Sequence, residues 1–137
     1  MPWFVDLGLE SNGAHYIEPD CNVSVIADNQ QSIKWHRDFN KTLQSVRQFS
    51  NSDADKLEFW HREFKPVLSE ILIPESRRPP VADAERIESL TKTPAGRLLL
   101  DVSKLSPLEF VQREFEHPFV QGALLFFNGL REVDLRL

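Results

Sequence analysis

Apolar and polar residues alternate in two short stretches of the first third of the chain. The alternating apolar positions are Val23, Val25, Ile33 and Trp35. A period of two is typical of half-buried strands, and the polar stretch 28–31 between them suits a turn. The sequence therefore predicts an antiparallel hairpin, and residues 15–18 are a candidate for a further short strand before it.

Beyond the hairpin, apolar residues recur every three or four positions, which is typical of amphipathic helices. Asp38 is the expected N-cap of a first helix that ends near Phe49. Ser50 and Ser52 are alternative caps of a longer second helix, which we expect to kink at Pro66 because proline lacks a backbone donor. The apolar stripe of this second helix consists of Leu57, Trp60, Phe64, Val67, Leu68 and Ile71.

The second half of the chain predicts shorter helices. Residues 74–82 contain three prolines and read as an exposed connector. Helices are expected at 82–90 and at about 95–102. Ser106, Pro107 and Glu109 then form a capping box with proline at the first helical position, which predicts a helix to about residue 115.

The last predicted helix covers residues 119–127 and ends at Asn128 and Gly129. It is apolar on almost every side. A surface helix would carry a polar face, so we expect this helix to lie in the core or to be covered by a ligand or a second chain.

Together these elements predict an α+β fold: a short antiparallel hairpin near the N-terminus followed by about five to six packed helices. A chain of 137 residues with 41% hydrophobic residues fits one domain, 1–137, with a real core. Few glycines argue against a barrel or sandwich rich in tight turns.

Charge and cysteine content narrow the partners and the compartment. A net charge of −5 leaves no electrostatic basis for gripping a phosphate backbone, so we expect no nucleic-acid partner. Cys21 is the only cysteine, which excludes an intrachain disulfide and any zinc site that needs paired thiolates. We find neither a basic leader with an apolar core nor an apolar run of about 18 residues, and we expect a cytoplasmic protein without a membrane span.

Recognisable catalytic motifs are missing from the sequence. It holds no glycine-rich nucleotide loop, no nucleophile elbow and no metal-ligand spacing, so we expect neither a bound cofactor nor a metal on this chain. His36 and Asp38, with Glu18 and Asp20 on a neighbouring segment, are the first candidates for acid-base chemistry. His61, beside the apolar stripe of the long helix, is the other.

Structural interpretations compete with these catalytic ones. Strand alternation places His36 on the solvated face of its strand, and Asp38 is fully explained as a helix cap. Aromatic residues could line a pocket for a hydrophobic ligand, or they could simply form the core. The candidates for substrate binding are Trp35, Trp60, Phe64, Phe126 and Phe127.

Several segments in order resemble a known family. They are the run 6–10, the step from Tyr16 to Asp20, the hairpin that ends at Trp35–Asp38, residues 49–54, and the stretch from Ser106 to Pro118 with the apolar helix after it. This order is similar to the substrate-binding, or cap, region of phytoene-desaturase-like, FAD-dependent oxidoreductases. The resemblance covers nearly the whole chain and lacks the family's flavin-binding segments.

The resemblance implies a substrate-binding domain, fragment or subunit that binds a hydrophobic small molecule and has no flavin site of its own. It also implies a flavin-binding partner chain, or a homodimer that covers either the hairpin edge or residues 119–130. The alternative is a stand-alone, cofactor-free cyclase, isomerase, dehydratase or binding protein that uses the aromatic residues and the two histidines. A module for protein interaction is the third possibility.

Overall fold

The computed structural model describes residues 2–129 and 134–136 of the chain. Strands β1 (Cys21–Ile26) and β2 (Ser32–His36) form an antiparallel pair. Val23 lies opposite Trp35 and Val25 lies opposite Ile33, with a register irregularity between Cys21 and Val23. The predicted hairpin is therefore confirmed.

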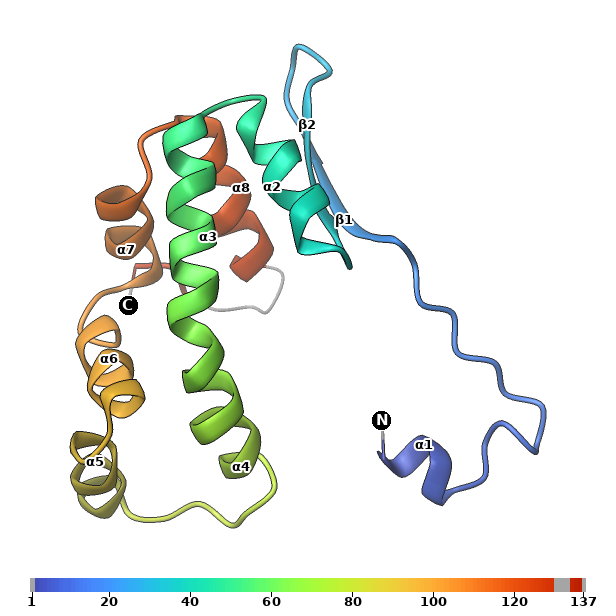
Figure 1. The fold of residues 1–137 in the computed structure, drawn as a ribbon, viewed down its shortest axis with the longest axis vertical. Coiled ribbons are helices and arrows are strands. Elements are labelled where there is room, and N and C mark those ends of the chain that lie inside the picture. The colour runs from blue at the N-terminus through green and yellow to red at the C-terminus, as the bar shows by residue number, and fades with distance from the viewer. Residues whose placement is uncertain (1, 130–133, 137) are drawn as a thin grey trace.

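Residues 14–20 form no strand, so the further strand proposed at 15–18 is wrong. The backbone there is extended, but the described residues place no neighbouring strand beside it. A helix that the sequence analysis missed, α1 (Pro2–Asp6), precedes this segment, and Phe4 packs edge-to-face on Tyr16 at 6.3 Å. Figure 1 shows that this N-terminal arm, residues 2–20, runs away from the helical body.

Helix α2 (Phe39–Arg47) follows the hairpin directly and lies beside β2. Its predicted N-cap is confirmed, because Asp38 has extended backbone angles and its Oδ1 accepts the N–H of Asn40 at 2.9 Å. Val46 and Leu43 turn into the core. A two-residue connection thus ties the helix and strand together.

A long helical rod, α3 (Asn51–Pro66), η1 (Val67–Leu72) and α4 (Ile73–Glu75), runs through the middle of the molecule (Figure 1). Ser50 is its cap, and Ser50 Oγ accepts the N–H of Asp53 at 3.0 Å. Pro66 does not end the rod. The chain passes instead into a wider, π-helical segment just after the proline, a feature often found where a helix accommodates a lost backbone bond.

Four shorter helices complete the fold: α5 (Asp83–Thr91), α6 (Pro94–Val102), α7 (Pro107–Glu114) and α8 (Pro118–Gly129). Thr93 caps α6, and the capping box of Ser106 and Glu109 is present in both directions. In Figure 1, α5, α6 and α7 follow one side of the rod, while α8, α2 and the hairpin lie on the other. The α+β class predicted from the sequence is confirmed.

The core has two parts. The larger cluster joins the hairpin, α2, α3, α7 and α8 around buried Ile33, Val46, Ala54, Val111 and Val120. The smaller cluster joins η1 to α5 and α6 around Val67, Ile71, Leu90 and Ala95. Because the rod contributes to both, it connects the two halves of the molecule.

Helix α8 is only partly covered. Val120 and Ala123 are each 1% exposed, whereas the side chain of Phe126 is 51% exposed. Residue 130, the end of the dimer face suggested by the sequence, lies outside the described residues. None of the helices in the described part of the chain is long and apolar enough to cross a bilayer.

Candidate functional site

An apolar groove of about 840 Å³ lies between the rod and helices α6 and α7. Its walls include Trp60, Phe64, Leu68, Leu99 and Phe110, and its floor includes Val67 and Val111, which are 1% and 4% exposed. We call this feature the aromatic groove. The three- and four-residue spacing of the α3 stripe puts these wall residues on one helical face.

Three rings form the centre of the groove wall. The ring centroids of Trp60 and Phe110 are 5.0 Å apart at 65°, and those of Trp60 and Phe64 are 5.3 Å apart at 32°. Phe64 and Phe110 also meet edge-to-face at 6.4 Å. Such edge-to-face arrangements are favourable for aromatic pairs and restrict how the rings can turn.

Glu114 fixes the indole of Trp60 from behind. Its Oε2 accepts the indole N–H of Trp60 at 3.0 Å and a hydrogen bond from Lys56 Nζ at 3.1 Å, and Arg113 Nε donates to Oε1 at 2.8 Å. The carboxylate side chain is only 12% exposed. Burial, the largest single influence, acts to raise the pKa of Glu114, but the hydrogen bonds from Arg113, Lys56 and Trp60 outweigh it and lower the pKa.

His61 is the histidine that lines the aromatic groove. Its imidazole stacks on the ring of Phe39, with centroids 3.7 Å apart and planes 17° apart. Of the candidates from the sequence, the groove therefore brings together His61, Trp60 and Phe64. Their catalytic and binding roles stay predictions.

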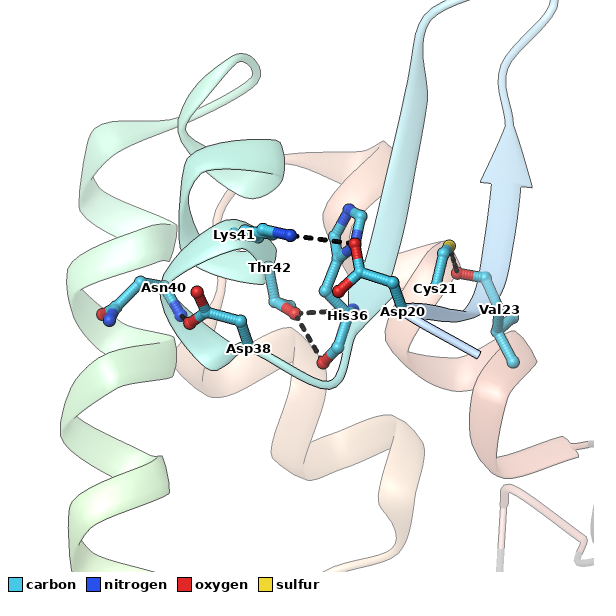
Figure 2. Close-up of polar contacts among 8 residues, drawn as sticks. All are labelled: Asp20, Cys21, Val23, His36, Asp38, Asn40, Lys41 and Thr42. Atoms are coloured by element: carbon cyan, nitrogen blue, oxygen red, sulfur yellow. Dashed lines mark hydrogen bonds and ion pairs between the residues drawn. The ribbon is translucent and has the colours of Figure 1, made fainter. Parts of the chain in front are cut away.

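His36 lies in a separate polar cluster where the hairpin meets α2. Its Nδ1 is 3.8 Å from Asp20 Oδ2, and Lys41 Nζ donates to the same carboxylate oxygen at 2.8 Å. The hydrogen bond from Lys41 and its positive charge lower the pKa of Asp20, and Asp20 in turn raises the pKa of Lys41. Figure 2 shows the His36 ring, the Asp20 carboxylate and the Lys41 amine directed toward one another.

The expectation that His36 lies on the solvated face of its strand is wrong, because its side chain is only 18% exposed. The start of α2 covers it, and its backbone N–H is bound by Thr42 Oγ1 at 2.9 Å. Asp38 performs the capping role, and its carboxylate binds the N–H of Asn40 rather than the histidine (Figure 2).

The remaining aromatic candidates lie on the other side of the molecule. Trp35 of β2 stacks on Phe127 of α8, with centroids 5.7 Å apart and planes 10° apart. Neither these two residues nor Phe126 is among the groove residues. Trp35 and Phe127 join the hairpin to α8, so their arrangement serves packing.

The described residues do not fit a dinucleotide. The strands among them are antiparallel, and the connection from β2 into α2 contains no glycine, whereas a flavin pyrophosphate is normally held by a glycine-rich turn between a parallel strand and a helix. In the same part of the chain, no three His, Cys, Asp or Glu side chains gather as metal ligands.

Sequence reasoning missed Glu114, Lys56 and Lys41. Their roles depend on contacts between residues far apart in the chain, such as the 54 positions that separate Trp60 from Glu114. Only Glu18 and Asp20 carried a local signal, through their position just before the hairpin. Glu18 pairs with Arg37, next to the His36 cluster.

Comparison with known proteins places the chain beside part of an oxidoreductase subunit. The relative is a subunit of the limonene dehydrogenase of Castellaniella defragrans, with 35% identity over 134 residues. The match covers 97% of this chain and 24% of the relative, so the chain spans about a quarter of that protein's length. No protein-family model and no solved structure matches the chain.

Proposed function

We propose that this chain is the substrate-binding segment of an FAD-dependent oxidoreductase and that the aromatic groove holds a small hydrophobic substrate. The groove carries the proposal. Its volume of about 840 Å³ lies within the range of roughly 300–1,000 Å³ typical of ligand pockets. The similarity to a limonene dehydrogenase subunit suggests an apolar hydrocarbon of that kind as the substrate.

The chemistry of the groove suits such a ligand. A hydrocarbon offers no hydrogen-bonding group, so its binding depends on the apolar area removed from water, about 25 cal/mol per Å². The rings of Trp60, Phe64 and Phe110 supply that area, and Glu114 holds the central indole in place before a ligand arrives. A wall that is already ordered loses little conformational entropy on binding.

The flavin belongs, in this proposal, to a different polypeptide segment or partner chain. The resemblance to FAD-dependent oxidoreductases supports the cofactor, while the described residues do not fit it. Equilibrium dialysis of the 137-residue chain against FAD tests this directly. We expect no stoichiometric flavin binding, and a tight one-to-one complex would contradict the assignment.

Titration with limonene tests the substrate role of the groove. We expect saturable quenching of tryptophan fluorescence by limonene, and a dissociation constant at least ten-fold weaker in Phe64→Ala, which corresponds to about 1.4 kcal/mol. The matched control is Phe126→Ala, which removes an exposed phenylalanine outside the groove. Circular dichroism verifies that both variants fold. Absence of saturable binding, or equal weakening in both variants, would refute the proposal.

A second candidate function has one observation in its favour, the imidazole of His61 at the wall of the groove. A cofactor-free isomerase, cyclase or dehydratase would use such a group for proton transfer to a bound hydrocarbon or alcohol. Gas chromatography after incubation with limonene or a terpene alcohol, without flavin, tests it. Turnover lost in His61→Ala and kept in His36→Ala supports this candidate, and absence of turnover in the parent chain excludes it.

A further inference from the structure

One edge of the hairpin is closed by side chains of α2. Ser45 Oγ accepts the N–H of Lys34 at 2.8 Å and donates to the carbonyl of Ser32 at 3.3 Å. One turn earlier, Thr42 Oγ1 accepts the N–H of His36 at 2.9 Å and lies 3.4 Å from the carbonyl of the same residue. These hydroxyls satisfy the outer backbone groups of β2, so no further strand can add there.

The other edge, along β1, is open. Because Lys34 directs its backbone N–H toward α2, its partner in the ladder, Ser24, directs its own N–H and carbonyl away from β2. The same alternation applies to Ile26, whose side chain is 70% exposed. In the part of the chain that the structure describes, the sheet has two strands, and nothing pairs with this edge.

The composition of β1 does not discourage pairing. Natural edge strands are usually protected by charged residues or proline, which oppose the addition of another strand. The β1 sequence, Cys-Asn-Val-Ser-Val-Ile, contains neither. Its alternation also leaves Val23 and Val25 on the core side of the sheet, where a neighbouring strand could extend the apolar face.

A second segment of the same chain has strand-like character and no strand partner. Residues 14–20 are extended, and the sequence pattern at 15–18 favours a strand. Ile17 is 83% exposed, which is unusual for an isoleucine. This segment runs straight into β1 (Figure 1), so it cannot turn back to pair with β1 of its own chain.

We infer that two copies of this chain pair edge to edge about a two-fold axis, the extended arm of each copy lying antiparallel against β1 of the other. The extended run from Tyr16 to Ile26 then pairs along its full length, and its midpoint is Cys21. The arrangement satisfies the outward backbone groups of Ser24 and Ile26 and covers Ile17. Each copy has a single open edge, so the assembly closes as a dimer.

Electrostatics permit this pairing. The acidic residues of the run, Glu18 and Asp20, are each paired with a cation of the same chain, Arg37 and Lys41. The four-stranded sheet that results has the order β2, β1, β1 of the second copy and β2 of the second copy. Its outer edges are both closed by α2 hydroxyls, which prevents growth into a fibre.

Sedimentation equilibrium of the 137-residue chain, over a concentration series, tests the inference. We expect a reversible dimer. Ser24→Pro removes the outward N–H and should weaken the dimer at least ten-fold, whereas the matched control Ser24→Ala keeps that N–H and should leave the dissociation constant unchanged. Ile17→Asp, in the exposed arm where folding is not at risk, should also weaken it at least ten-fold. A monomer at every concentration overturns the inference, as does a dimer that resists Ser24→Pro and Ile17→Asp.

Chemical cross-linking at Cys21 locates the interface. Paired strands place opposite Cα atoms about 4.5–5.5 Å apart. A short bis-maleimide should therefore join the two thiols into a covalent dimer, and Ile17→Asp should abolish that product. The variant Cys21→Ser serves as the control for reaction at other groups. If the parent chain dimerises without forming this product, the two copies meet elsewhere and the inference is wrong.

Discussion

At the scale of single residues, Asp53 has a larger role than its local position suggests. It is 1% exposed, and its two carboxylate oxygens accept the backbone N–H groups of Glu116 at 2.8 Å and His117 at 3.0 Å. The sequence offers it as the third residue of a helix cap. The structure uses it to bind the start of α3 to the connection between α7 and α8.

Replacement of Asp53 by asparagine tests this role. The amide nitrogen cannot accept a hydrogen bond, so one of the two buried N–H groups loses its partner, at a cost of about 1–3 kcal/mol. The matched control is Asp55→Asn, whose side chain is 69% exposed and whose effect should stay within about 0.5 kcal/mol. Urea denaturation measures both changes, and equal losses would contradict the explanation.

Glu114 predicts a pH dependence of stability. Its pKa is lowered in the folded state, because the hydrogen bonds from its three donors outweigh burial. A lowered carboxyl pKa contributes stability above the unfolded value, near 4.5, and this contribution is lost as the pH falls through the folded pKa.

The variant Glu114→Gln should therefore be less stable than the parent at pH 7, and the difference should shrink below about pH 4.5. Asp101→Asn serves as the control, since the Asp101 ion pair with Lys104 is exposed and exposed pairs contribute about 0–1 kcal/mol. Urea denaturation from about pH 3 to pH 7 measures the differences. A Glu114→Gln difference that is constant across this range would contradict the assignment.

At the scale of helices, two glycines predict opposite results. A Cβ atom built on Gly96 in α6 would lie 2.1 Å from the carbonyl oxygen of Leu90, at the end of α5, so alanine there forces the two helices apart. At Gly122 in α8 nothing lies within 4 Å of such an atom. Gly96→Ala should destabilise the protein by about 1–3 kcal/mol, and Gly122→Ala should stabilise it by up to about 1 kcal/mol.

Thermal unfolding followed by circular dichroism distinguishes the two variants. We expect the melting temperature to fall for Gly96→Ala and to rise for Gly122→Ala. The pair controls for the substitution itself, because both glycines lie in helices and neither has a positive φ angle. A rise for both variants would mean that α5 and α6 are not in close contact at this point.

The sequence predicted those elements whose signals are local. Asp38, Ser50 and Ser106 begin helices because a side chain and a backbone N–H two or three positions later suffice to form each cap. The hairpin followed from alternation alone. The π-helical segment after Pro66 was not predicted, since it depends on how η1 packs against α6 as well as on the proline.

The candidate site was predicted only in part for the same reason. Trp60 and Phe64 were found because helical spacing puts them on one face of α3. Phe110 faces them, and Glu114 binds Trp60, only after α7 packs against the rod, which no spacing in the sequence encodes. The half-buried state of His36 likewise results from the start of α2 folding over the strand.

At the scale of the whole molecule, the two core clusters differ in size, and the smaller one should open first. The larger cluster contains seven buried residues and the smaller one four. Helices α5 and α6 contact the rest of the protein mainly through η1. We therefore expect their amides to exchange with solvent through a partial opening that leaves the larger cluster intact.

Native-state hydrogen exchange with two core variants tests this order. Val46→Ala weakens the larger cluster, which is present both before and after the partial opening, so it should speed exchange in α2 and α3 without changing α5 and α6. Leu90→Ala weakens the smaller cluster, and its loss of about 2–5 kcal/mol should speed exchange in every helix, because full unfolding starts from the same native state. If Val46→Ala speeds exchange in α5 and α6 as much as in α2, the molecule unfolds as one unit. The aromatic groove, which lies across the junction of the two clusters through Phe64, Val67 and Leu99, would then have no separately movable wall.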